Sequence, residues 1–242
     1  MAESDREAFA HWCRVVADGV PETADQIPEA WAQLLTLLYA TIAAKSADNP
    51  DTDLLSALVA VRDEGDRLTT NDLVSISVLI MLGGLMTTVD LISSAMLALL
   101  LNPEQLDAAR ENPKAVVEET LRHSPPLELP MARFATEDLV VGGVQISQGD
   151  AVFLVISAAN HDPDRFAAPD EFDVRRDTSG HLAFGHGMHH CLGAPLARIE
   201  GEVAIATLLD RFPEVRLDID PDTIQWRANP MQRGPLTLPV TY

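Results

Sequence analysis

The sequence predicts an α+β chain that is mainly α-helical, with only small sheets at its periphery. Three observations lead to this class. Apolar residues recur at helical spacing through His123, two Asn-Pro steps interrupt that pattern, and strand-type alternation begins only near Leu139. With 242 residues, 47% of them hydrophobic and 22% charged, the chain can bury a core.

Four helices are expected before Asn102, because each apolar stripe begins at a residue that can cap or start a helix. The expected ranges are 4–18 with Ser4 in a capping box, 28–45 opened by Pro28, 54–62, and 70–101 capped by Thr70. The uncharged run from Leu73 to Val89 is long enough to raise the question of a membrane span. Its two serines, two glycines and two threonines favour a buried core helix instead.

The Asn-Pro steps at 102–103 and 112–113 each end one helix and start the next. The second step opens a short helix that carries Glu118, Glu119 and Arg122 and ends before Ser124. Composition then changes toward strands and loops. The expected elements are a hairpin at 139–146, a strand at 151–156, a long irregular stretch at 160–187, a helix from about 192 to 211, and short strands near Val215 and at 236–240.

Charge and cysteine content exclude several classes of protein. Seventeen basic against 37 acidic residues give a formal charge of −20, which argues against binding nucleic acid or an anionic membrane. Cys13 and Cys191 are too few for a disulfide framework, and the first residues lack a basic-then-apolar signal region. We therefore expect a cytoplasmic protein.

The strongest chemical signal is a glycine-punctuated loop that delivers one cysteine directly before a helix. Residues 184–193 read FGHGMHHCLG and include Cys191. Backbone N–H groups of a tight loop and of a helix start favour a thiolate, and glycines let the backbone approach a flat iron porphyrin. Spacing alone leaves three interpretations of comparable weight: haem ligation, a zinc site with the nearby histidines, or a small buried cysteine. The nearby histidines are His186, His189 and His190.

Residues 184–198 resemble the cysteine-loop signature FGxGxHxCxGxxLAR of bacterial cytochromes P450 at every fixed position. Other motifs follow in that family's order along nearly the whole chain. The resemblance implies an N-terminally truncated cytochrome P450-type fold, one haem domain over residues 1–242, and haem b as the cofactor. It implies that Cys191 ligates the iron. The other implied cofactor contacts in the loop are Phe184, Gly185, His189, Gly193 and Ala197.

Glu119 and Arg122 resemble the family's ExxR pair. They lie one turn apart on one helical face, so the carboxylate can hold the guanidinium in a fixed orientation. Arg176, with Arg175 as a second candidate, resembles the third member of the group. The implied role is a charge network that locks the cysteine loop. Taken alone, such a pair is more often on the surface, by roughly ten to one; its order before the cysteine loop favours the network.

Three residues resemble positions that neutralise the haem propionates: Arg133, His189 and His181. The long helix 70–101 resembles the family's distal helix, and Gly84, Met86 and Thr87 lie on its segment (A/G)Gx(D/E)T. The glycines permit a local distortion there, and Thr87 matches the hydroxyl that serves the dioxygen site.

Met86 stands where the family usually carries an acid that relays protons. Methionine has no titratable proton, which favours a peroxide-driven reaction or a non-oxidative rearrangement over ordinary monooxygenation. By resemblance the substrate contacts are mostly apolar, so a small, partly hydrophobic organic substrate is expected. These contacts are Leu85, Leu127, Leu129, Met131 and Met231.

The family's usual N-terminal half, with its helices and sheet, has no counterpart in this sequence. Apolar surface would then need cover, so we expect a homo-oligomer or a partner chain. The leading functional prediction is a haem-thiolate oxidoreductase in secondary metabolism, using dioxygen or peroxide. Electrons would come from a ferredoxin or a flavoprotein reductase, because no GxGxxG motif follows a strand. The alternatives are a catalytically silent partner or activator of another biosynthetic enzyme, and a fragment of a longer enzyme.

Overall fold

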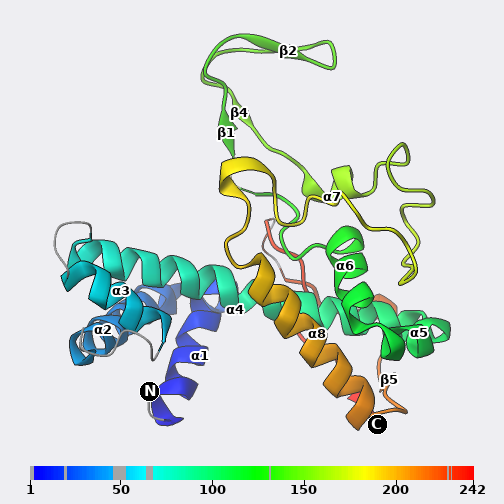
Figure 1. Ribbon diagram of the computed structural model, residues 1–242, viewed down its shortest axis with the longest axis horizontal. Coiled ribbons are helices and arrows are strands. Elements are labelled where there is room, and N and C mark those ends of the chain that lie inside the picture. Colours follow the sequence, from blue (N-terminus) through cyan, green and yellow to red (C-terminus); the bar gives the residue numbers. More distant parts are fainter. Residues whose placement is uncertain are drawn as a thin grey trace. The chain divides into compact units, whose positions relative to one another are not determined.

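The computed structural model describes residues 3–18, 21–45, 53–63, 68–130, 132–227, 229 and 231–242. Figure 1 shows helices dominating the fold, with a few short strands, so the predicted α+β, mainly helical class is confirmed. The helices are α1 (Glu3–Asp18), α2 (Ile27–Ala44), α3 (Leu54–Asp63), α4 (Thr70–Leu101), α5 (Leu106–Glu111), α6 (Pro113–His123), α7 (Ile156–Asn160) and α8 (Ala194–Arg211). Short 3₁₀ turns are η1 (Pro21–Gln26), η3 (Pro103–Gln105), η4 (Gly187–His189) and η5 (Pro221–Thr223).

The chain divides into two compact units, Met1–Met86 and Thr87–Tyr242, with the division inside α4. The expectation of one domain over residues 1–242 stays a prediction. In the first unit, Ile42, Val59, Leu73 and Val74 form a buried apolar cluster between α2, α3 and the start of α4.

The cap of α4 lies one residue earlier than the sequence suggested. The Asp72 N–H donates to Oγ1 of Thr69 at 3.1 Å, and the Thr69 N–H donates to Oδ2 of Asp72 at 2.8 Å. This reciprocal pairing satisfies two amide groups at the helix start, which Thr70 would not do. The expected cap at Thr70 is therefore wrong by one position.

Core packing in the second unit brings α4, α6 and α8 together. Leu91, Val117 and Leu121 form one buried cluster. A Cβ at Gly201 on α8 would come within 3.0 Å of the Val117 side chain, so the absence of a side chain allows α8 to approach α6 closely. A larger cluster, which includes Ala95, Met96, Leu99 and Ile205, completes this core.

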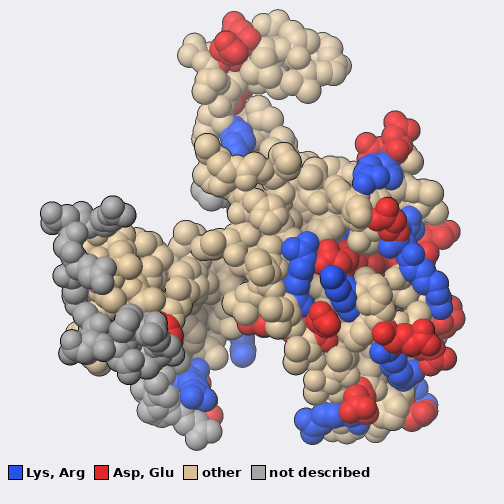
Figure 2. All heavy atoms as spheres, viewed as in Figure 1, with Lys and Arg blue, Asp and Glu red and all other residues tan. Residues whose placement is uncertain are grey.

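Three two-stranded antiparallel sheets lie at the periphery: β1 (Arg133–Phe134) with β4 (Ala151–Val152), β2 (Leu139–Val141) with β3 (Val144–Ile146), and β5 (Arg216–Leu217) with β6 (Val240–Thr241). The predicted hairpin at 139–146 is confirmed, and its turn uses left-handed backbone at Gly142 and Gly143. Figure 2 shows few charged side chains on this hairpin, whereas both signs of charge gather over α5 and α8. Val140, Val141 and Val144 are exposed there.

Two strand predictions are corrected by the structure. The strand expected at 151–156 stops at Val152, because its partner β1 offers only two residues for pairing, and Ile156 begins α7. The strand expected at 236–240 is confined to Val240–Thr241, since the Leu236 N–H donates to the Gln225 carbonyl outside that sheet. The strand β1 was not predicted, because a two-residue strand carries no readable alternation.

Among the described residues, α4 is the helix long and apolar enough to cross a membrane by length and composition. In its second half, Leu91, Ala95 and Leu99 are buried in the core of the second unit. This packing is that of a core helix. In its first half Leu79 is exposed.

Candidate functional site

The cysteine loop, residues 184–193, contains η4 and leads directly into α8, and its backbone is tightly folded. The Cys191 N–H donates to the Phe184 carbonyl at 2.9 Å, and the His190 N–H donates to the Gly187 carbonyl at 3.0 Å. Gly185 and Gly187 have φ values of +71° and +79°, a left-handed backbone that favours glycine. The sequence places glycine where the loop must turn, and the turn brings Cys191 back over Phe184.

The surroundings of Cys191 suit a flat apolar cofactor. Cys191 is exposed, and Met188 and Leu192 beside it are 94% and 89% exposed. Large apolar side chains at such exposure in a well-packed loop indicate a surface that another group covers. With one soft thiolate donor and no bulky side chain at Gly193, these residues fit a haem iron and its macrocycle.

Glu119, Arg122 and Arg176 come together in a buried network. Glu119 Oε2 accepts from Nε of Arg122 at 2.8 Å, and Oε1 accepts from Nη2 of Arg122 at 2.7 Å and from Nε of Arg176 at 3.2 Å. Glu119 and Arg122 are both fully buried. Arg176, rather than the alternative Arg175, contacts the carboxylate. The remaining Arg122 nitrogen donates to the carbonyls of Asn160 and Pro169.

Hydrogen bonds connect this network to the cysteine loop. The buried side chain of Asn160 accepts from the Leu182 N–H at 2.7 Å and donates to the Leu121 carbonyl at 3.3 Å. Leu182 in turn accepts from the Gly185 N–H at 2.8 Å. Phe184 packs against the buried cluster of Leu91, Val117 and Leu121. The loop is therefore fixed both by polar contacts and by apolar packing.

A second ionic cluster, formed by Glu118, His181 and Arg198, borders the loop. Glu118 Oε2 lies 3.0 Å from Nε2 of His181, and Oε1 accepts from Nε of Arg198 at 2.5 Å. Burial raises the pKa of Glu118, but the hydrogen bonds from His181 and Arg198 outweigh it and lower that pKa to about 2. The Arg198 guanidinium also stacks over the Phe184 ring, 4.6 Å from its centroid.

His181 was expected to face a haem propionate, and in this structure both of its ring nitrogens have partners within the protein. Nε2 faces Glu118, and Nδ1 accepts from the Ala183 N–H at 3.2 Å. Arg133 in β1 and His189 in η4 are both exposed. Ala197 lies in the first turn of α8, half-buried. Sequence reasoning missed the roles of Glu118, Asn160 and Arg198, because their partners lie 22 to 80 positions away.

The expected substrate contacts and the expected distal-site residues Gly84, Met86 and Thr87 fall into three groups. Leu127 pairs with Gln232 in a short bridge, and the N–H groups of Glu128 and Leu129 donate to the Met231 carbonyl, so three of these residues are neighbours. Met131 lies outside the described residues. Gly84, Leu85 and the buried Met86 belong to the first unit, and Thr87 begins the second.

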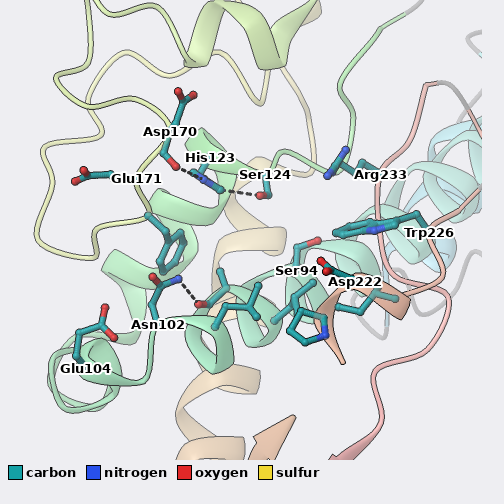
Figure 3. A pocket seen from close by; sticks show the side chains of 16 residues that line it. Ser94, Asn102, Glu104, His123, Ser124, Asp170, Glu171, Asp222, Trp226 and Arg233 are labelled. Atoms are coloured by element: carbon teal, nitrogen blue, oxygen red, sulfur yellow. Dashed lines mark hydrogen bonds between the residues drawn. The ribbon is translucent and has the colours of Figure 1, made fainter. Parts of the chain in front are cut away.

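No group of three or more His, Cys, Asp or Glu side chains among the described residues could hold a metal ion. The histidines near Cys191 therefore do not form a multidentate zinc site with it. A separate cavity of about 730 Å³ lies in the second unit. Figure 3 shows it between Ser94, His123, Asp222 and Trp226, and no residue of the cysteine loop lines it.

Comparison with known proteins identifies similar chains. The family model described as Cytochrome P450 matches residues 113–228. The chain is 41% identical to cytochrome P450 107B1 of Saccharopolyspora erythraea and 42% identical to the cytochrome P450 monooxygenase PikC of Streptomyces venezuelae, over 99% and 100% of its length. It covers 59% and 58% of those proteins, so it spans about three-fifths of their length. The solved structure of the Bacillus subtilis cytochrome P450 PksS matches 100% of this chain, over 63% of its own, with a TM-score of 0.90 and 36% identity.

Proposed function

Because this chain belongs to the cytochrome P450 family, we propose that it is a haem-thiolate oxidoreductase in which Cys191 ligates the iron of haem b. One observation carries the proposal. An exposed cysteine, flanked by exposed apolar residues, stands on a glycine-turned loop that a buried Glu–Arg network holds in place. A loop whose only role was structural would bury these side chains.

The remaining roles follow from the positions of the charged groups. Arg133 and His189 would neutralise the propionates, since both are exposed and can donate to carboxylates. The same role for His181 stays a prediction, and its Nε2 lies 3.0 Å from Glu118 Oε2. Glu119, Arg122 and Arg176 hold the loop, while Phe184, Gly185, Gly193 and Ala197 shape its surface toward the cofactor.

When bound, the haem supplies activation of dioxygen or peroxide, and the thiolate favours cleavage of the O–O bond. Thr87 would contribute a hydroxyl on the distal side, and Gly84 would allow the local helix distortion. Met86 can neither donate nor accept a proton there, so proton delivery depends on water or another group, or the oxidant is peroxide. Leu127, Leu129 and Met231, which are neighbours in the second unit, would line an apolar substrate site, and the same role for Leu85 and Met131 stays a prediction.

The substrate class is a small, partly hydrophobic organic molecule of secondary metabolism. The relatives' names support this class, since one is a 6-deoxyerythronolide B hydroxylase and another a polyketide biosynthesis cytochrome P450. Others are a vitamin D(3) 25-hydroxylase and a biotin biosynthesis cytochrome P450, which favours a general apolar site over one compound. We propose a ferredoxin or flavoprotein reductase as electron donor, a cytoplasmic location, and a homo-oligomer or partner chain that covers exposed apolar residues of α8. These are Leu196, Ile199 and Val203.

A catalytically silent partner or activator of another enzyme is the second candidate. The observation that favours it is Met86, a buried apolar side chain where the family usually has an acid. Met86→Glu should raise reductant-driven turnover several-fold if the missing acid limits the reaction. Unchanged turnover in a haem-loaded variant would remove the missing acid as the explanation.

The deciding experiment is the absorption spectrum of the reduced, carbon monoxide-treated protein. We expect a strongly red-shifted Soret band, which reports a thiolate ligand, and its loss in Cys191→Ser. The matched control is Cys13→Ala, because Cys13 is buried in α1 and should leave the band unchanged. Absence of haem, or an unshifted band in the unmodified protein, would contradict the enzyme proposal and favour the silent partner.

A further inference from the structure

Asp90 is a fully buried carboxylate in α4, one turn after Thr87. Its Oδ1 accepts from Nη2 of Arg227 at 3.0 Å, and burial raises its pKa to about 7. Gly234 lies directly against it, because a Cβ at that position would overlap Asp90 Oδ1. Any side chain at residue 234 would collide with the carboxylate, so Asp90, Arg227 and Gly234 fit together as a unit.

Arg227 and Gly234 belong to the two arms of a hairpin, residues 225–236. The Arg227 N–H donates to the Gly234 carbonyl at 3.0 Å, and the Leu236 N–H donates to the Gln225 carbonyl at 2.8 Å. Trp226 pairs with Pro235 between them. Figure 3 shows that Trp226 and Arg233 border the cavity near Ser94, one turn of α4 beyond Asp90. The ion pair thus joins the stem of the hairpin to α4.

The far end of the hairpin carries Met231 and pairs with the segment 126–129. The Glu128 N–H donates to the Met231 carbonyl at 3.1 Å, and the Arg233 N–H donates to the Pro126 carbonyl at 2.9 Å. Leu127 bridges to Gln232. The segments expected to line the substrate site are therefore hydrogen-bonded to one another, and the stem that carries them is held to α4 through Asp90.

The ion pair between Asp90 and Arg227 is not the most stable arrangement that this buried position allows. Asp90 Oδ2 is buried and has no hydrogen-bond partner among the described residues, so the carboxylate is only half satisfied. Apolar residues of similar volume are often as stable as a buried ion pair, or more so. A buried, half-satisfied carboxylate is better explained by the position that it imposes on Arg227.

We propose that Asp90 is a positioning residue that fixes the hairpin 225–236, and with it Met231 beside Leu127 and Leu129. Its pairing with Arg227 under Gly234 sets the distance of this hairpin from α4. The meaning of these positions as substrate lining rests on the proposed function, whereas the mechanical role of Asp90 does not.

Hydrogen exchange tests the mechanical role without haem. In Asp90→Asn, which keeps the shape but removes the charge, the amides of Arg227, Leu236, Glu128 and Arg233 should exchange about tenfold faster. The amides of β2 and β3, which lie outside the hairpin, should be unchanged and serve as the control within the same molecule. Unchanged exchange at the four amides, or an equal rise in β2 and β3, would overturn the proposal.

Ligand binding tests the connection to the site in the haem-loaded protein. Imidazole, a small iron ligand, should bind Asp90→Asn with unchanged affinity, while phenylimidazole, whose ring reaches the lining, should bind about tenfold more weakly. Equal effects on both ligands would overturn the positioning of the lining. Failure of the unmodified protein to bind haem would contradict the proposed function, and the exchange result would still decide the mechanical role.

Discussion

Glu119 and Asp90 are both fully buried carboxylates paired with arginine in the second unit, yet their surroundings differ. Glu119 accepts four hydrogen bonds on its two oxygens, including one from the Asp173 N–H at 2.9 Å. Asp90 uses one oxygen, and the other has no partner among the described residues. The first site compensates the loss of hydration of its charges far better than the second.

Because their hydrogen bonding differs, the Glu119 network and the Asp90 pair serve the fold in different ways. The Glu119 network is a rigid support, because each of its charges is satisfied and its contacts lead to the cysteine loop. The Asp90 pair holds a hairpin with a single ionic contact, so small changes there should move the hairpin without unfolding the unit.

Arg122→Ala is expected to lower the free energy of unfolding more than any other change considered. This change leaves Glu119 buried with only Arg176 and one amide as partners, and removes the donors to the Asn160 and Pro169 carbonyls. Removing one partner of a buried pair typically costs about 3 to 5 kcal/mol. Denaturant unfolding followed by circular dichroism should show this loss in the free energy of unfolding. A loss below about 1 kcal/mol would mean that the network is not a rigid support.

Acid should weaken the Glu118 cluster. The pKa of the Glu118 carboxyl is about 2 in the folded protein against an ordinary value of 4.5, so the folded state favours its ionised form. This contribution is present above pH 4.5 and is lost as the pH falls toward 2. Because the cluster is partly exposed, solvent screening keeps this contribution to about 1 kcal/mol.

The free energy of unfolding should be measured at a series of pH values. Its decrease below pH 4.5, the acid limb of the profile, should be smaller in Glu118→Gln. Asp90 has the opposite sign. Burial raises its pKa from 3.8 to about 7, so ionising Asp90 beside Arg227 costs the folded protein stability as the pH rises from 3.8 toward 7. Asp90→Asn should therefore leave the acid limb in place. An acid limb that persists in Glu118→Gln would show that other carboxylates produce it.

Gly234→Ala should lower the free energy of unfolding by about 1 to 3 kcal/mol, since the new methyl group would overlap the Asp90 carboxylate. Shortening Asp90 to alanine removes the two closest contacts but leaves the Cβ of residue 90 at 2.8 Å from the new methyl group, so Gly234→Ala should cost less, but not nothing, in an Asp90→Ala background. A double-mutant cycle of unfolding free energies measures this coupling. Additive effects would show that Gly234 and Asp90 do not act as a unit.

Much of the fold could be predicted from the sequence where the signals are local. Asn112 caps α6 through its side chain, and the Gly142–Gly143 turn sets the register of β2 and β3, as expected from their residue types. The cysteine loop was recognisable for the same reason, because its glycines and Cys191 lie within ten consecutive residues. Strand ends depend on distant partners, which explains the errors at 151–156 and 236–240.

Parts of the site that depend on distant pairings could not be predicted. Asp90 and Arg227 are 137 positions apart, and neither lies in a motif that marks it as buried. The pairing of His181 with Glu118 could not be predicted either, because the two residues are 63 positions apart. Burial and pairing at such separations are decided by how α4, α6 and the long irregular segment pack together.

The smallest effect is expected for Asp107→Asn, and it sharpens the contrast. Asp107 and Arg110 pair at 3.0 Å with the same three-residue spacing as Glu119 and Arg122, but the Asp107 side chain is 95% exposed. Solvent screens such a pair, so the unfolding free energy should change by less than about 0.5 kcal/mol. Sequence spacing cannot distinguish the two pairs, and only their positions relative to the core make one a support and the other a surface contact. A loss comparable to that of Arg122→Ala would mean that spacing, rather than burial, sets the energy of these pairs.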